Sequence, residues 1–224
     1  MNKKVSCDNY GKFIKELSNR FMASVEIDGD LVTCYVKSSS KLCNYLELKN
    51  KKVLLKENKN SKFKYFIYAV KYKRSAILLC PSLSNNIVFD SLNKRIFSFL
   101  EKRKNCALEF NICGYKSDLY IPESKTFIEI KSIISYEDEV LFPTVYSERF
   151  VNQLNDFDSL LKIYKGYLFL VCLNPYCKSI KLKSNSKDVD LLRKQIKNGL
   201  IIKGFVIDFI NGYPTIKKEI PIII

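Results

Sequence analysis

Histidine and tryptophan are both absent from the 224-residue sequence, and long apolar runs are missing as well. Without histidine, Ser-His-Asp and Cys-His catalysis are excluded, as is any histidine general base. No run of about eighteen apolar residues occurs, so we predict no transmembrane helix. The first residues also lack the apolar core of a signal peptide. We therefore expect a cytoplasmic protein in which any catalysis rests on carboxylates, Lys, Tyr, Cys or an oxygen-bound metal.

Paired metal-ligand cysteines are missing too, because none of the eight cysteines forms a C-x-x-C pair. A zinc site would require four scattered cysteines to converge, so we predict none. Cys80 and Cys172 lie inside apolar runs, which is typical of small core residues.

Acidic residues are too few to balance the basic ones: 38 Lys and Arg stand against 23 Asp and Glu, a net charge of +15. Residues 1–80 carry 17 of these cations and only 7 of the acids. This excess favours a polyanionic partner, nucleic acid before an anionic membrane surface. The alternative is a composition that is simply rich in Lys, Ile, Asn and Tyr. The apolar content of 47% predicts a folded chain with a substantial core.

Short β-rich runs separated by polar turns characterise residues 1–80. An Asp-Gly turn at 28–30 between two such runs indicates a hairpin. Phe13, Ile14 and Leu17 have a spacing that predicts one helical turn. Strands are expected at 20–27, 31–36, 52–56, 63–70 and 75–79. Five short strands in this span predict a small barrel or sandwich.

Basic residues alternate with aromatic ones at 62–66 and 68–74. Cations neutralise phosphates and rings stack on bases, so this texture suits a nucleic-acid-binding surface. An ordinary barrel strand, with rings inside and lysines outside, would give the same pattern. The residues predicted to contact DNA, without base specificity, are Arg20, Lys37, Lys41, Lys62, Lys64, Tyr65 and Lys116.

From residue 81 onward helices alternate with strands. Helices are predicted at 84–104, with Ser84 or Asn85 as its cap, from Ser147 to Gly166, and at 187–198. Strands are expected at 106–112, around Asp118, around Glu129, at 167–173 and at 200–210. The order α-β-β-β-α-β-α-β predicts an α/β mixed sheet with helices on its faces. We place a domain boundary at residue 80, giving domains 1–80 and 81–224.

Glu129 and Lys131 interrupt an apolar strand. Side chains two residues apart on a strand share a face, and Asp118 on the preceding strand is expected to reach that face. The pattern Glu-x-Lys occurs four times in the sequence, but only this pair lies inside an apolar strand. A buried acid and lysine are costly unless they are paired or bind a ligand.

An Asp, followed on the next strand by an acid-x-Lys, is the layout of a metal-dependent nuclease site. Asp118, Glu129 and the Ile130 carbonyl are hard oxygen ligands for Mg²⁺ or Mn²⁺. Lys131 would orient the attacking water and hold the phosphate. The alternative is a buried salt bridge from Lys131 to Glu129 or Asp118, with no metal ion.

Six ordered motifs make nearly the whole chain resemble the sugar fermentation stimulation protein (SfsA) family. They are Asn-Arg-Phe-Met-Ala-Ser-Val-Glu-Ile at 19–27, Lys-Ser-Asp-Leu at 116–119, Phe-Ile-Glu-Ile-Lys-Ser at 127–132, Leu-Phe-Pro-Thr at 141–144, Ser-Glu-Arg at 147–149 and Ile-Pro-Ile-Ile-Ile at 220–224. The resemblance implies an OB-like N-terminal barrel and a C-terminal domain of the PD-(D/E)XK nuclease superfamily. It also implies DNA binding and, in bacteria, a regulatory link to sugar metabolism.

The family pattern also implies roles for single residues. The superfamily motif falls on Asp118, Glu129 and Lys131, Glu109 matches a further acid as a possible metal ligand, and Glu148 and Arg149 match a pair beside the catalytic site. For this pair the alternative is a charge that suits a helix N-terminus and a surface arginine. Two motifs differ: Lys-Ser-Ser-Ser at 37–40 replaces the family's Pro-Asn-Thr-Gly, and Asn-Gln at 152–153 replaces its Lys-His.

Three hypotheses follow. The first is a DNA-binding protein with a metal-dependent nuclease site that uses Mg²⁺ or Mn²⁺. The second is a DNA-binding regulator that keeps the fold without cleavage. The third is a binder of membrane surfaces or acidic proteins through the basic N-terminal half. The oligomeric state has no signal in the sequence.

Overall fold

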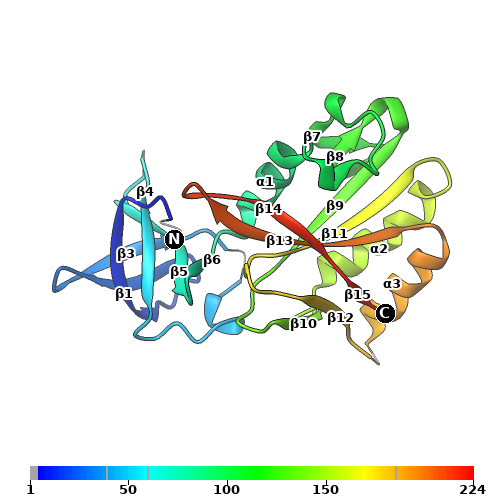
Figure 1. Cartoon of the computed structure of the whole chain (residues 1–224). Helices are drawn as coiled ribbons and strands as arrows, with labels where there is room; N and C mark the ends of the chain where they lie inside the picture. Colours follow the sequence, from blue (N-terminus) through cyan, green and yellow to red (C-terminus); the bar gives the residue numbers. More distant parts are fainter. Residues whose placement is uncertain (1–4, 39, 60, 185) are drawn as a thin grey trace.

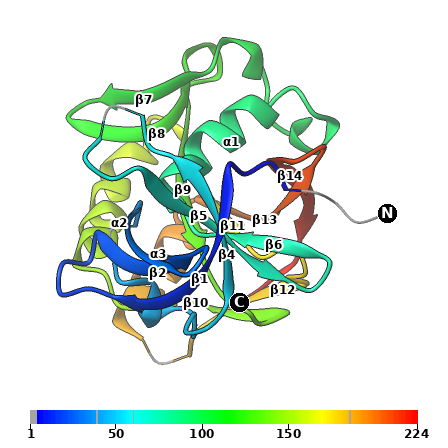
Figure 2. The same cartoon turned by 90° about the vertical axis from the view of Figure 1, so that its left-hand side faces the viewer.

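Five strands close a barrel in the N-terminal part of the chain (Figures 1 and 2). The computed structural model describes residues 5–38, 40–59, 61–184 and 186–224. The barrel strands are β1 (Asn9–Glu16), β2 (Met22–Ile27), β3 (Asp30–Val36), β4 (Lys52–Glu57) and β5 (Tyr65–Tyr72). They pair in the order β3-β2-β1-β4-β5, and a parallel β3–β5 pairing closes the ring. The strand β6 (Ser75–Leu78) continues the sheet beyond β5. The predicted OB-like barrel is confirmed.

The helical turn predicted at Phe13, Ile14 and Leu17 is wrong, because this segment lies in and just after β1. The register of β1 against β2 shifts between Phe13 and Lys15. Such a bulge places neighbouring apolar residues at irregular positions, and their spacing then imitates a helix. Apolar and polar residues therefore do not alternate regularly in this segment, although it forms a strand.

A six-stranded mixed sheet follows the barrel. Its strands are β7 (Ala107–Ile112), β8 (Tyr115–Ile121), β9 (Thr126–Ile133), β11 (Lys165–Cys172), β13 (Ile201–Ile210) and β14 (Tyr213–Ile220). They are ordered β14-β13-β11-β9-β8-β7. The pairings of β11 with β9 and β13 are parallel, and the outer pairings are antiparallel. This confirms the mixed sheet predicted from the order of elements.

Helices cover both faces of this sheet, which buries two apolar clusters. The α-helices are α1 (Ser84–Ser91), α2 (Glu148–Leu160) and α3 (Lys187–Lys197). α1 shares a cluster with Ile128 and Ile130 of β9, whereas α2 and α3 share the other with Phe127 and Ile133. Alternate residues of β9 therefore face opposite helices. Short 3₁₀ turns lie at Leu42–Asn44, Pro81–Leu83, Arg95–Phe97, Arg103–Asn105 and Pro122–Ser124.

Two predicted helix boundaries are wrong. The helix predicted at 84–104 ends at Ser91, because the chain turns to bury Phe97 against Phe169 and Phe205, with ring centroids 6.0 and 5.0 Å apart. Gly166 does not end α2 but lies in β11, where an added Cβ would come within 2.6 Å of Phe127. Close packing therefore explains this glycine.

A small third sheet was not predicted. It consists of β10 (Glu139–Phe142), β12 (Ser179–Leu182) and β15 (Ile222–Ile223), in that order and with parallel pairing. Strands of four and two residues carry too little periodicity to stand out in a sequence. In this sheet β12 lies between the segment before α2 and the last strand of the chain.

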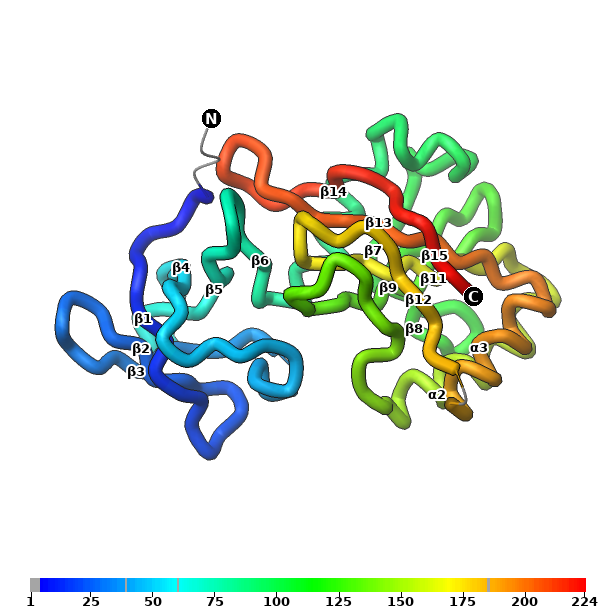
Figure 3. The backbone as a smooth tube through the Cα atoms, turned by 60° about the horizontal axis from the view of Figure 1, so that its bottom comes forward, coloured from blue at the N-terminus to red at the C-terminus, as the bar shows by residue number. Residues whose placement is uncertain are grey.

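The barrel and the mixed sheet are joined by direct contacts. The rings of Tyr68 and Phe209 lie 5.9 Å apart, and the Leu78 amide donates to the Leu173 carbonyl. Near the start of the chain the Ser6 amide donates to the Gly212 carbonyl at the tip of the β13–β14 hairpin (Figure 3). Within the described ranges, no helix has the length and apolarity needed to cross a membrane.

Candidate active site

The strands β8 and β9 separate at the point where Asp118 lies. Their backbone pairing runs from Ile121–Thr126 to Leu119–Ile128 and includes no pair beyond that. The next inward N–H group on β9, that of Ile130, instead donates to Asp118 Oδ2 at 2.7 Å. The side chain of Asp118 thus takes over one rung of the ladder, and a pocket opens where the backbones part.

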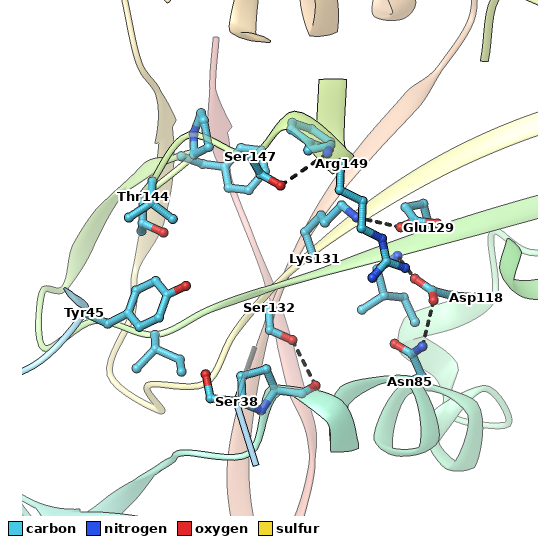
Figure 4. A pocket seen from close by; sticks show the side chains of 17 residues that line it. Ser38, Tyr45, Asn85, Asp118, Glu129, Lys131, Ser132, Thr144, Ser147 and Arg149 are labelled. Atoms are coloured by element: carbon cyan, nitrogen blue, oxygen red, sulfur yellow. Dashed lines mark hydrogen bonds and ion pairs between the residues drawn. The ribbon is translucent and has the colours of Figure 1, made fainter. Parts of the chain in front are cut away.

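The second oxygen of Asp118 is also bonded. Asn85 Nδ2 in the first turn of α1 donates to Asp118 Oδ1 at 2.8 Å (Figure 4). Asn85 was predicted as a possible helix cap, but α1 begins without a side-chain cap. Its amide is used to hold the carboxylate instead, so the N-cap prediction is wrong.

Glu129 lies at the centre of a denser network and is 2% exposed. Its Oε1 accepts from Lys131 Nζ at 2.6 Å and from Gln153 Nε2 at 2.7 Å. Its Oε2 accepts from the Tyr115 hydroxyl at 2.5 Å. Gln153 Oε1 in turn accepts from Lys131 Nζ at 2.5 Å. Each of the three donors fixes the carboxylate, so a buried acid is kept without an unsatisfied oxygen.

Asp118, Glu129, Ile130 and Lys131 all line one pocket of about 350 Å³. The four residues therefore share one pocket, and the closer approach expected of metal ligands stays a prediction. Lys131 is not sealed in a dry core, since 22% of its side chain is exposed at the pocket wall. The predicted Glu129–Lys131 ion pair is present as well. The pocket and the ion pair coexist in the same site.

Burial raises the pKa of Asp118 from 3.8 to about 6, and the nearby charge of Glu129 adds to the effect. The Ile130 amide, Lys131 and Asn85 act in the opposite direction. Burial, followed by the charge and hydrogen bond of Glu129, also raises the pKa of Tyr115 far above its ordinary value, so this phenol is a donor at any working pH.

The three remaining predicted site residues are placed differently. Arg149 lines the pocket, and its side chain extends from the start of α2 into the space above Asp118 in Figure 4. Glu148 precedes it in the first turn of α2 but does not line the pocket. Glu109 is exposed and pairs with Lys116 at 2.5 Å, again outside the pocket lining. The geometry thus gives no support to Glu109 as a metal ligand or to Glu148 as a catalytic group.

The predicted nucleic-acid contacts also divide into groups. Arg20 and Lys37 line a second hollow on the barrel, and Lys41, Lys62 and Lys64 are exposed. Tyr65 is buried, so the prediction that it contacts nucleic acid is wrong: β5 is enclosed on both faces from Tyr65 to Val70. Lys116 is exposed, but Glu109 already neutralises its charge. Ser39 of the divergent 37–40 segment lies outside the described residues.

Three residues that hold the two carboxylates had been missed: Asn85, which bonds Asp118, and Tyr115 and Gln153, which bond Glu129. Gln153 could have been found, because it is three residues after Phe150 and four before Phe157 on the apolar stripe of α2. A polar residue in such a stripe requires a buried partner. No comparable signal marks Asn85 or Tyr115.

Two acidic side chains among the described residues, Asp118 and Glu129, line the pocket and offer oxygen ligands for a metal ion. In the described part of the chain, no group of three or more His, Cys, Asp and Glu side chains is arranged to hold an ion. Two carboxylates and a carbonyl still suit Mg²⁺, which keeps several of its waters. The donor set therefore fits a hard divalent ion, provided that the ion competes with Lys131 for Glu129 Oε1.

Comparisons with known proteins agree with this architecture. A family model described as the SfsA N-terminal OB domain matches residues 17–79, and one described as the sugar fermentation stimulation protein RE domain matches residues 82–210. A sugar fermentation stimulation protein homolog from Ruminiclostridium cellulolyticum is 28% identical over 222 residues, covering 95% of this chain and 96% of the relative. The homolog from Carboxydothermus hydrogenoformans is 30% identical over 167 residues, covering 71% and 72%.

A solved structure shows the same fold. It is described as Pyrococcus furiosus SfsA in complex with Ca²⁺, and it matches with a TM-score of 0.81 at 15% sequence identity, covering 100% of both chains. Matches of this extent in sequence and in fold establish the assignment: the chain belongs to the sugar fermentation stimulation protein (SfsA) family, with an N-terminal OB domain and a restriction-endonuclease-like domain.

Proposed function

We propose that this protein binds DNA and hydrolyses its phosphodiester bonds with a divalent metal ion, Mg²⁺ or Mn²⁺. The observation that carries the proposal is the convergence of Asp118, Glu129 and Lys131 on one solvent-reachable pocket. Two acids and a lysine on adjoining strands are the chemical groups that this reaction needs. The Ca²⁺ in the described Pyrococcus furiosus structure supports a divalent ion in this fold.

The electrostatic cost of placing two carboxylates side by side in a buried site supports a cation as the ligand of that site. Burial raises the pKa of Asp118 to about 6, with a further contribution from Glu129, so two neighbouring carboxylates are held where their charges repel. A divalent ion would be held by Asp118, Glu129 and the Ile130 carbonyl. When bound, it would polarise the phosphate and lower the pKa of a water molecule.

The protein's own residues have separate tasks in this proposal. Lys131 presents its ammonium group at the pocket wall, where it can hold a non-bridging phosphate oxygen and orient the attacking water. Gln153 positions both Lys131 and Glu129 through one amide. Among the described residues Arg149 has no carboxylate within ion-pair distance, so its guanidinium is available to a phosphate at the pocket rim.

A second candidate is a DNA-binding regulator without cleavage. The specific observation in its favour is that both oxygens of Glu129 are already bonded by Lys131, Gln153 and Tyr115. A network of this kind is stable without an ion and would explain a fold that is kept for binding alone.

Cleavage assays with a matched lysine control separate the two candidates. Single-stranded, double-stranded and branched DNA are incubated with Mg²⁺, Mn²⁺ or EDTA. Lys131→Ala is compared with Lys203→Ala, which removes another half-buried strand lysine that pairs with a glutamate and lies over a ring. We expect metal-dependent cleavage by the wild type and by Lys203→Ala. In Lys131→Ala we expect the cleavage rate to fall by roughly a hundredfold or more. Equal background cleavage by all three proteins would exclude the nuclease and favour the DNA-binding regulator.

A further inference from the structure

Three aromatic rings form a column on the barrel beside the active-site pocket. Phe21 stacks on Tyr35 with centroids 6.2 Å apart and planes inclined by 26°, and Tyr35 stacks on Phe63 at 6.3 Å and 12°. The three residues come from the turn before β2, from β3 and from the loop before β5. All three rings are only half-buried. Segments distant in sequence thus build one continuous aromatic surface, which we call the ring column.

Cations accompany the ring column along its length. Arg20 lies 4.7 Å from the centre of the Phe21 ring, and Lys62 lies 5.1 Å from that of Phe63. Lys37 follows β3 and lies over Phe66 at 3.6 Å. Within the described ranges no carboxylate pairs with these three cations, so their charges are free for a ligand. Positive charge next to stacked rings is the combination that single-stranded nucleic acids bind.

The ring column leads to the active-site pocket. Phe21 and Tyr35, with Arg20 and Lys37, line a hollow of about 500 Å³. Ser38 and Pro81 line this hollow and also the pocket that contains Asp118 and Glu129. The two cavities therefore adjoin at the passage from the barrel to α1. A strand lying on the column is already directed at the proposed site of cleavage.

We propose that the ring column binds the unpaired bases of a single-stranded nucleic acid and guides its backbone into the Asp118–Glu129 pocket. Stacking on a protein ring requires a free base face, and bases inside a duplex do not offer one. The binding step stands on the barrel surface alone, whereas the destination of the strand rests on the proposed function. DNA and RNA strands share the chemistry concerned, so both are included in the test.

The experiment measures binding without metal, so that cleavage has no part in it. Fluorescence anisotropy in EDTA compares labelled DNA and RNA strands of about 16 nucleotides with a duplex of equal length. Tyr35→Leu and Phe63→Leu remove one ring each but keep apolar cover. Tyr10→Leu is the matched control, because Tyr10 is a barrel ring that is 39% exposed and lies 4.4 Å from a lysine, Lys52, but is not part of the ring column. Circular dichroism melting checks that all variants are folded.

We expect a single strand to bind about tenfold more tightly than the duplex. Each ring-column variant should lose about fivefold or more in affinity for the strand, with no loss in affinity for the duplex. Tyr10→Leu should stay within about twofold of the wild type. Tighter binding of a DNA strand or of an RNA strand than of the duplex supports the proposal, and the tighter of the two strands shows which sugar the ring column prefers. Equal affinity for strand and duplex, or an equal loss in Tyr10→Leu, overturns it.

This outcome is separable from that of the proposed function. If strands bind through the ring column but no metal produces cleavage, the binding inference stands and the nuclease proposal fails. If DNA is cut in a Lys131-dependent manner while both ring variants bind as the wild type does, the nuclease proposal stands and the ring column is only barrel packing.

Discussion

Glu129 lies at the centre of the site, and its hydrogen-bond partners show which contacts could be predicted from the sequence. Its place inside an apolar strand, two residues from Lys131, predicted a paired or ligand-binding acid, and the pairing is present. The partners Tyr115 and Gln153 come from other elements. Spacing within one strand carries no information about which side chains of other elements reach it, so only part of the network could be predicted.

At the same scale, Asp118 gives a pH-dependent prediction for the metal-free protein. Its pKa is raised from 3.8 to about 6, so the folded state binds this proton more tightly than the unfolded state does. Ionised Asp118 therefore costs stability above about pH 6, and the cost declines as the pH falls through 6 toward 4. Asp118→Asn should be more stable than the wild type by roughly 2–3 kcal/mol near pH 8.

Urea unfolding in EDTA across this range measures the difference. The advantage of Asp118→Asn should shrink steadily below about pH 6 and vanish below about pH 4. An advantage that does not change with pH would mean that burial does not perturb this carboxyl group.

Gln153 provides a second test at the residue scale. Gln153→Leu removes the amide that positions Lys131 and Glu129. We expect the free energy of unfolding to fall by about 1–2 kcal/mol and the cleavage rate to fall by roughly tenfold or more. Gln195→Leu is the control, since Gln195 is another buried helix glutamine that donates to an acid, Asp158, outside the pocket. It should lose similar stability in urea unfolding but no activity at permissive temperature. Equal activity in the two variants would remove Gln153 from the site.

At the scale of elements, regular periodicity decided what could be predicted. The helix predicted to start at Ser147 is present as α2, and Ser147 is its N-cap. The helix predicted at 84–104 was cut short because Phe97 is buried from a position outside the helical stripe. The separation of β8 from β9 was also not predictable, since it depends on Asp118 replacing a backbone partner of Ile130. Tertiary packing outweighs local pattern in both cases.

The start of α2 carries Arg149 into the pocket, so its cap is open to a direct test. Ser147 Oγ accepts from the Phe150 amide at 3.3 Å. Ser147→Ala should lower the free energy of unfolding by about 1 kcal/mol, and Ser147→Asp, which keeps an accepting oxygen, should restore most of it. Thermal and urea unfolding measure both variants. An alanine variant as stable as the aspartate variant would show that this cap does not hold the helix.

At the scale of the whole molecule, charge and shape act together. The excess of cations in residues 1–80 is the basis for expecting a polyanion on the barrel. The folded chain then places the barrel hollow against the acidic pocket through Ser38 and Pro81. The order of elements predicted a barrel or sandwich followed by a mixed sheet, and the family resemblance implied the OB-like and nuclease-like folds. Their adjacency needed the structure, because it depends on contacts such as that of Tyr68 with Phe209.

This arrangement predicts how salt affects binding. The logarithm of DNA affinity should fall linearly with the logarithm of salt concentration, and Arg20→Gln or Lys37→Gln should each reduce the slope by about 0.7 for a single strand. Lys116→Gln should leave the slope unchanged, because Glu109 already pairs with this lysine. Anisotropy titrations at several salt concentrations supply the slopes. A flat response in the wild type would argue against the barrel as an electrostatic binding face.

The central claim is that Asp118 and Glu129 hold a divalent metal ion, and calorimetric titration of the 224-residue chain with Mn²⁺ above the pKa of Asp118 tests it most directly. Asp158→Asn is the matched control, because Asp158 is a carboxylate with lysine and amide partners outside the pocket. We predict one bound ion per chain in the wild type and in Asp158→Asn, and a loss of at least tenfold in affinity, roughly, in Glu129→Gln. No binding by the wild type, or binding that Glu129→Gln leaves unchanged, would contradict the account.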